Sequence, residues 1–383
     1  MNGTRFPALA ALILCGACTD PSQSVGPPVT ASEARKPAPA GIGIIDLGTL
    51  NGNTSRAYGL NSPPDGQRLL IVGEAQNAAG QTRAAYWSYD RVSGARTPAA
   101  ALVATDDMQS TAWDVNEAEQ IAGWSYTSIT PTSSIQRGVR WTPSGGATFL
   151  ATFLGNLGGG SSTQANDINS AGEIIGAATT ADGQSHAFFW TPDPAPSGTL
   201  TDLVFFSGND VQAVDRNQYG AIVGSVRSTP ADLQTAFVWS LSLGLVRLPD
   251  LGPPPPGDGV QSYATAINDA GVIVGFVNTA GVRISAVRWT PSGVGGAYVV
   301  EDLGLGAGSR AFDINNAGEI VGDYRSRQGA TGFYRSATSF KQLPLLSNSA
   351  TAFRINERGD IVGYSYLRNS YVHAVLWTNV RGQ

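Results

Sequence analysis

Apolar and polar residues repeat in seven similar units along the chain after residue 40, with a period of roughly 40 to 55 residues. Each unit opens with a short alternating segment that ends in Asn, followed by a turn and an apolar Ile-x-Gly segment. A third segment ends in an aromatic residue, and a fourth carries leucine. The Asn residues that end the first segments are Asn61, Asn116, Asn169, Asn217, Asn268, Asn315 and Asn356.

The second and third segments give the repeat its clearest landmarks. Four short segments separated by turn residues are typical of a propeller blade, whose sheet must stack on its neighbours to bury its faces. The Ile-x-Gly segments start at Ile71, Ile121, Ile174, Ile222, Ile273, Ile320 and Ile361. The third segments end at Trp87, Trp141, Trp190, Trp239, Trp289, Arg335 and Trp377.

The two ends of the repeat region predict how the ring closes. The seventh unit ends at Trp377 without a leucine segment, while Ile42 to Leu50 is a leucine segment that precedes the first unit. Pairing the two would remove the exposed sheet edges that invite aggregation. We therefore predict an all-β fold over residues 41–383, a seven-bladed β-propeller of four-stranded blades, with the N-terminal strand closing the last blade.

Repeated Asn and Gly residues are expected to shape the turns. An Asn side chain can bond to backbone two residues on, and a Gly three positions later supplies positive φ for the hairpin. The exceptions are Glu119 in the second unit and an insertion before Gly66 in the first. The Gly of Ile-x-Gly predicts a bulge or a close backbone approach.

A calcium loop is the alternative interpretation of the stretch DINNAGEIVG. Asp313, Asn315 and Gly318 match the start of an EF-hand loop. However, the fifth loop position is Ala317, and no acidic residue ends the loop. In other units the Asp position holds Gly59, Ala266 and Arg354. We therefore predict a turn and expect neither a metal site nor a cofactor.

Composition narrows the function classes. Hydrophobic residues make up 42% and charged residues 14%, and the formal net charge is −5. Because acidic residues outnumber basic ones, nucleic-acid binding is not expected. The chain after the first 18 residues has no Cys, and its two His occupy repeat positions that other units fill differently. A His- or Cys-based nucleophile is therefore disfavoured and no catalytic residue is assigned, although a carboxylate pair could still serve a hydrolase or lyase.

The N-terminus has the pattern of an export signal. Arg5 precedes the apolar run Ala8 to Leu14, and Gly16-Ala17 are the small residues before a cleavage point. With Cys18 next, residues 1–17 resemble a bacterial lipoprotein signal peptide, which implies lipid attachment at Cys18. An ordinary secretory signal is the alternative. Residues 18–40 are rich in Pro, Ser and Ala, as in an extended tether. We expect an exported protein of the cell envelope or extracellular space, with membrane contact only through this anchor.

The repeat also resembles a known family. The pattern A-x-D-I-N-x-x-G-x-I-V-G, the segment His186 to Phe189 (HAFF) and the D-L-G strands are similar to the HAF-family extracellular repeat proteins. The family's His is present at His186 and His373, and five other units have Arg, Thr or Ser there. The resemblance covers nearly all of the chain after the tether. It implies an exported bacterial repeat protein and no particular activity.

Aromatic residues that follow Ile-x-Gly in three units are the candidate ligand-binding residues. Together they could form an arc at the rim for stacking on sugars or anchoring a protein. Packing between strand neighbours is the alternative. The residues are Trp124, Tyr126, Tyr324, Arg325, Tyr364 and Tyr366.

Three functions remain open at this point. The first is a monomeric, non-catalytic binding module for polysaccharide or an envelope protein, because loops on a rigid scaffold carry function. The second is a structural scaffold for envelope assembly. The third is a carbohydrate-active hydrolase or lyase, which acidic side chains converging at the channel mouth would favour.

Overall fold

The computed structural model describes residues 41–104, 107–130, 133–192, 198–203, 210–227, 233–252, 259–279, 283–293, 296–327 and 329–381. The predicted signal peptide, the tether and Cys18 lie outside these residues. Within them, no helix is long and apolar enough to cross a membrane.

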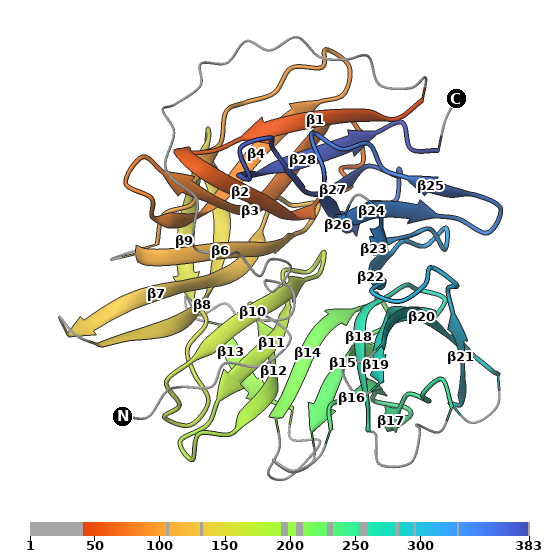
Figure 1. Cartoon of the computed structure of the whole chain (residues 1–383). Coiled ribbons are helices and arrows are strands. Elements are labelled where there is room, and N and C mark those ends of the chain that lie inside the picture. The colour runs from red at the N-terminus through yellow and green to blue at the C-terminus, as the bar shows by residue number, and fades with distance from the viewer. Residues whose placement is uncertain are drawn as a thin grey trace.

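Seven antiparallel four-stranded sheets form the blades of a propeller (Figure 1). The first four blades are β2 (Asn51–Leu60), β3 (Arg68–Asn77), β4 (Thr82–Asp90), β5 (Ala100–Ala101); β6 (Asp107–Val115), β7 (Ile121–Thr130), β8 (Ser133–Gly145), β9 (Thr148–Phe153); β10 (Thr163–Ile168), β11 (Ile174–Thr179), β12 (Ser185–Thr191), β13 (Thr199–Asp202); β14 (Asp210–Arg216), β15 (Ile222–Arg227), β16 (Thr235–Ser240), β17 (Gly244–Arg247). The last three are β18 (Val260–Ile267), β19 (Ile273–Thr279), β20 (Arg283–Pro291), β21 (Tyr298–Asp302); β22 (Arg310–Ile314), β23 (Ile320–Ser326), β24 (Gly329–Arg335), β25 (Phe340–Gln342); β26 (Ala350–Ile355), β27 (Ile361–Tyr366), β28 (Val372–Thr378), β1 (Gly43–Gly48).

The predicted fold and its closure are confirmed. The last blade has the strand order β1-β28-β27-β26, so the N-terminal strand is its outermost strand. Figure 1 shows β1 in orange-red beside β28 in dark blue. The Nδ1 atom of His373 lies 2.9 Å from Oδ1 of Asp46 across this junction. The innermost strands contact one another in ring order, and β26 contacts β2, so the ring is complete.

A β-bulge lies at the same place in every inner strand. In β6 the register with β7 shifts between Ala112 and Asp114, and the other six blades shift at the equivalent residues. The Gly of Ile-x-Gly faces this bulge, where a Cβ on Gly123 would lie 2.1 Å from the carbonyl oxygen of Thr111. In all seven blades that separation is 1.8–2.1 Å. The predicted close backbone approach is confirmed, and it explains why no larger residue stands there.

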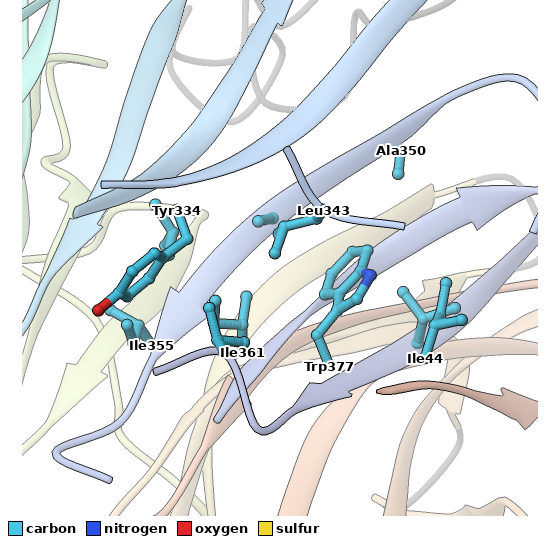
Figure 2. Packing of buried hydrophobic residues seen from close by; sticks show 11 residues of the cluster. Ile44, Tyr334, Leu343, Ala350, Ile355, Ile361 and Trp377 are labelled. Carbon is cyan, nitrogen blue, oxygen red and sulfur yellow. The ribbon is translucent and has the colours of Figure 1, made fainter. Parts of the chain in front are cut away.

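Hydrophobic cores fill the spaces between neighbouring blades. In the core between the sixth and seventh blades, Trp377 lies between Ile361 and Ile44, with Leu343 of the sixth blade nearby (Figure 2). Trp377 and Ile361 are fully buried. They pair across β27 and β28, as the Ile and the aromatic residue do in every blade that has both. The repeated Ile and Trp are therefore core residues that hold adjacent blades together.

The repeated Trp also bonds to the preceding blade. Trp141 Nε1 donates a hydrogen bond to the carbonyl of Val103 at 3.2 Å, and Trp377 donates to Pro344 at 2.8 Å. Trp289 makes the same bond to Pro249 at 2.7 Å. In the sixth blade, which has Arg335 in place of Trp, the guanidinium donates to the carbonyl of Leu303. Arg335 thus preserves a bond between blades that the exception in the sequence would otherwise lose.

The Asn residues that end the inner strands form a belt around the ring. Asn315 accepts the backbone N–H of Glu319 within its own turn at 3.0 Å and donates to the carbonyl of Asn356 in the next blade at 3.1 Å. Asn116, Asn217, Asn268 and Asn356 likewise donate to the Asn carbonyl of the following blade. The bond predicted from sequence, to backbone two residues on, is made by Asn116, which accepts the N–H of Ala118 at 3.1 Å. The bond between blades is an additional role for the same side chain.

Candidate functional site: the central channel

The residue after the repeated Ala of each inner strand points into the central channel. These seven residues surround one pocket, which encloses about 700 Å³ of space including open solvent at its mouth. They are Tyr58, Trp113, Asn166, Val214, Thr265, Phe312 and Phe353. Gln164 and Gln212 line the pocket one layer nearer the mouth, and Arg354 lies one layer deeper. Because the bulge opposes two residues to one, Phe353 and Arg354 both face the channel.

One half of the pocket wall is aromatic. It comes from four consecutive blades of the ring, the sixth, seventh, first and second. The ring centroid of Phe353 lies 5.2 Å from those of Phe312 and Tyr58, and Tyr58 lies 4.5 Å from Trp113. These tilted and edge-on contacts are the arrangements that aromatic rings prefer. The result is a continuous apolar surface on one side of the channel.

Two ion pairs support this aromatic half. Arg56 and Glu74 lie 2.9 Å apart in the first blade, and the hydroxyl of Tyr58 donates to Glu74 at 3.1 Å. Burial, together with the neighbouring Glu74, raises the pKa of Tyr58 well above its usual value. In the sixth blade Arg310 pairs with Asp323 at 2.7 Å, and its guanidinium lies 5.2 Å from the ring centroid of Phe312. These contacts fix the orientation of the rings.

Apart from Val214, the opposite half of the wall is polar and uncharged. Gln164 donates to Asn166 at 2.9 Å, and Asn166 donates to the carbonyl of Ala213 at 2.7 Å. The Thr265 hydroxyl lies within hydrogen-bond distance of the carbonyls of Val274 and Ala311. These three side chains therefore have partners inside the protein. Their remaining lone pairs and N–H groups provide a hydrogen-bonding surface opposite the aromatic rings.

Gln212 differs from the rest of the polar half. Only 5% of its surface is exposed, yet within the described residues its side-chain amide makes no hydrogen bond to protein. Its amide atoms are not among the buried side-chain atoms that lack a partner, so they face the open space of the pocket. There the amide N–H and C=O groups are available to water or to a ligand. Gln212 is therefore the pocket residue best placed to bond to a bound molecule.

Four aspartates converge on Arg354 at the floor of the pocket. Its Nη2 atom lies 2.8 Å from Asp114 and 3.3 Å from Asp167, and its Nη1 atom lies 3.8 Å from Asp215 and 3.9 Å from Asp313. All four carboxylates are at least nine-tenths buried. Three of them also accept a backbone N–H from the next blade, namely those of Ile168, Ile267 and Ile355.

The floor holds more acidic groups than its single guanidinium can balance. Burial raises the pKa of Asp313 to about 7, with Arg354 opposing the rise and Asp215 adding to it. Burial also raises the pKa of Asp167 well above its usual value and raises that of Asp215. Among the described residues, none of the four aspartates lines the pocket. The acidic residues therefore converge beneath the pocket rather than at its mouth, and they join the blades.

The candidate aromatic residues occupy two different faces of their strands. Trp124 pairs with Thr111 and Tyr364 with Thr351, so these two are equivalent. The equivalent residue in the sixth blade is Asp323, and Tyr324 is one position out of step. Because side chains alternate along a strand, Tyr324 faces the other way. Its ring contacts Phe333 and Phe340.

Tyr364 and Tyr366 belong beside the channel. Their ring centroids are 6.0 Å apart, and Tyr364 lies 5.6 Å from Phe353 of the aromatic half. Trp124 and Tyr126 contact each other at 5.2 Å in an edge-on arrangement. Arg325 is exposed at the end of β23. The candidate residues thus include two that adjoin the pocket and none that lines it in the described part of the chain.

Sequence reasoning missed the channel-facing ring. The signal was present, because the residue after Ala varies between units while Ala, Ile and Gly around it repeat. In the first, second and sixth units this residue is Tyr58, Trp113 and Phe312. A position that varies inside a fixed frame is the natural place for unit-specific chemistry.

Comparison with known proteins identifies no family. No protein-family model matches the chain, and no curated protein is a significant sequence match. The resemblance to HAF-family proteins therefore stays a prediction.

Three solved structures illustrate the similarity in fold. A protein of unknown function from Dyadobacter fermentans is 10% identical over 88% of this chain and 98% of its own, with a TM-score of 0.47. A fungal alcohol oxidase of the AA5 family, in complex with copper, is 15% identical over 88% of this chain and 75% of its own, with a TM-score of 0.49. The Aleuria aurantia lectin, in complex with alpha-methyl-L-fucoside, is 10% identical over 85% and 94%, with a TM-score of 0.37. These likenesses are too distant to carry a function to this chain.

Proposed function

We propose that this protein is a non-catalytic binding module whose central pocket holds a sugar unit of a polysaccharide. The observation that carries the proposal is the two-sided pocket wall. Aromatic faces suit the apolar C–H surface of a sugar ring, and the opposing amides and hydroxyl suit its hydroxyl groups. Gln212 is the central polar contact, because its amide lines the pocket and has no partner among the described residues.

The cellular location of this module is part of the same proposal. Export through residues 1–17, attachment at Cys18 and the tether to residue 40 would place the propeller at the cell envelope, where polysaccharides are abundant. Membership of the HAF-family repeat proteins would be consistent with this location. Chemical analysis of the mature N-terminus tests this location. An acylated Cys18 at the N-terminus supports the lipid anchor, whereas a mature protein that begins after Cys18 without modification contradicts it.

A matched pair of glutamine variants tests the pocket. Full-length protein is assayed for retention on an array of bacterial and plant polysaccharides, followed by titration with the glycan retained. Gln212→Ala removes an amide that bonds to no described residue, so stability should be unchanged while affinity falls about tenfold. Gln234 is also buried, but its amide donates to the hydroxyl of Ser225 at 2.8 Å. Gln234→Ala should therefore lower stability and leave affinity unchanged.

Other outcomes would redirect the proposal. Loss of retention in Trp124→Ala with Tyr366→Ala, but not in Gln212→Ala, would move the site from the pocket to the rim. Release of new reducing ends from the retained glycan would indicate a hydrolase. Retention of no glycan at all would contradict polysaccharide binding and favour an envelope protein as the partner.

A further inference from the structure

Arg354 crosses the central channel. It comes from β26 in the seventh blade, yet its guanidinium lies within 3.9 Å of carboxylates from the second, third, fourth and sixth blades. Only a group near the channel axis can contact strands on so many sides. The guanidinium and its aspartates therefore form a plug across the channel, directly beneath the pocket.

Three blades have no acidic residue in this layer; the seventh supplies Arg354, and the other two leave little space around the plug. The first blade has Gly59, where a Cβ would lie 2.8 Å from the carbonyl oxygen of Trp113 in the neighbouring strand. The fifth has Ala266, which is fully buried. Beneath this layer, the belt of Asn side chains ties the ends of the inner strands together. The channel is thus closed on the side where the inner strands end.

The pocket consequently has one entrance, at the end where the inner strands begin. Its lining runs from Gln212 at the mouth layer to Arg354 at the floor layer. Three residues separate these two layers along a strand, which corresponds to roughly 10 Å. A chain that entered this pocket could not continue through it. An interior unit of a polymer, which is joined to neighbours on two sides, would need a second exit.

We propose that the pocket recognises the terminal unit of a glycan chain rather than an interior segment. This inference rests on the proposed function, because it assumes that the ligand is a saccharide. The end unit would enter between the aromatic half and Gln212, and the rest of the chain would extend from the mouth. The amount of bound protein would then depend on the number of chain ends, as it does for a receptor of cleaved or short glycans.

The test compares chains that differ only in their number of ends. Cellulose, chitin, mannan, xylan and linear β-1,3-glucan are each used as competitors in two forms, a soluble derivative or fraction of the polymer and its purified hexasaccharide, at equal mass. Recognition of ends predicts that the hexasaccharide competes at a lower mass concentration, by about the ratio of the two chain lengths. Recognition of interior segments predicts equal or better competition by the polymer. That second result would overturn the inference and leave polysaccharide binding intact.

A second pair of variants connects end recognition with the channel. Val214 is half-buried in the layer beneath Gln212, so Val214→Trp should fill the pocket and abolish binding of the hexasaccharide. Val299 is 60% exposed on the outer strand β21, and Val299→Trp should bind the hexasaccharide like the unaltered protein. Unchanged binding of the hexasaccharide by Val214→Trp would show that the channel is not the binding site. Failure of every polymer and every hexasaccharide to bind would reject both this inference and the proposed function beneath it.

Discussion

The two ends of the central channel are built on different principles. At the closed end, Asn ends the inner strand of all seven blades and Asp stands in the layer above it in four, and these side chains link most blades to the next. At the mouth, the equivalent positions hold four residue types, with Arg, Thr and Gln in two blades each and Tyr263 in one. Repetition thus marks a structural task that every blade shares. Variation inside that frame marks the part of the molecule that is free to acquire specificity.

The largest expected difference between the ends concerns stability. Asn315 is buried, and its amide bonds to Glu319 at 2.6 Å as well as to the next blade. Removing these bonds leaves buried partners unsatisfied, so Asn315→Ala should lower the free energy of unfolding by about 2 kcal/mol. Asn369 is exposed in the loop between β27 and β28 at the mouth end, and Asn369→Ala should change it by less than about 0.5 kcal/mol. Chemical denaturation of both variants measures the contrast, and equal losses would contradict it.

The second prediction concerns pH and the floor of the pocket. Asp313 has its pKa raised to about 7 in the folded protein, against an ordinary value of 3.8. A group whose pKa is raised by folding stabilises the protein at low pH and loses that contribution as pH rises through the folded value. The free energy of unfolding should therefore fall between pH 3.8 and about 7, and Asp313→Asn should make that fall shallower. Denaturation across this pH range measures the slope.

A carboxylate outside the channel provides the control for this pH effect. Hydrogen bonds from the Thr180 hydroxyl and the backbone N–H of Gln184 lower the pKa of Asp182, which is exposed in the loop between β11 and β12. Asp182→Asn should leave the fall above pH 3.8 intact, because Asp182 is already ionised over that range. If both variants changed the slope equally, the plug would not be its source.

The sequence predicted the features that depend on residues close together in the chain. Blade number, strand order and the closure by β1 followed from the repeat and from the position of the missing strand. The turn geometry followed from Asn and Gly, which act within a few residues of each other. These features are local or are dictated by the closure of a ring, so one unit contains the information for all seven.

The pocket could not be predicted in the same way because it depends on contacts across the ring. Arg354 appeared in the sequence only as an exception that weakened a calcium motif, yet it meets carboxylates from four other blades. Tyr324 was grouped with Tyr364, although one position of strand register places them on opposite faces. Both cases require knowledge of which side chains meet across the channel or share a face. A repeat pattern alone does not provide it.

The smallest expected effect lies in the one turn of the closed end that departs from the repeat. Glu119 has a φ of 58°, where the equivalent residues of the other six blades are Gly with φ between 63° and 85°. A side chain in this left-handed conformation costs roughly 1–2 kcal/mol. The partner of Glu119, Arg68, is exposed and 3.9 Å away, so losing that contact should cost little. Glu119→Gly should therefore raise the free energy of unfolding by about 1 kcal/mol without altering binding at the mouth. Glu119→Ala is the control, because it removes the same carboxylate but keeps the backbone strain. If Glu119→Ala raised the free energy of unfolding as much as Glu119→Gly, then charge, and not backbone conformation, would limit the stability of this turn.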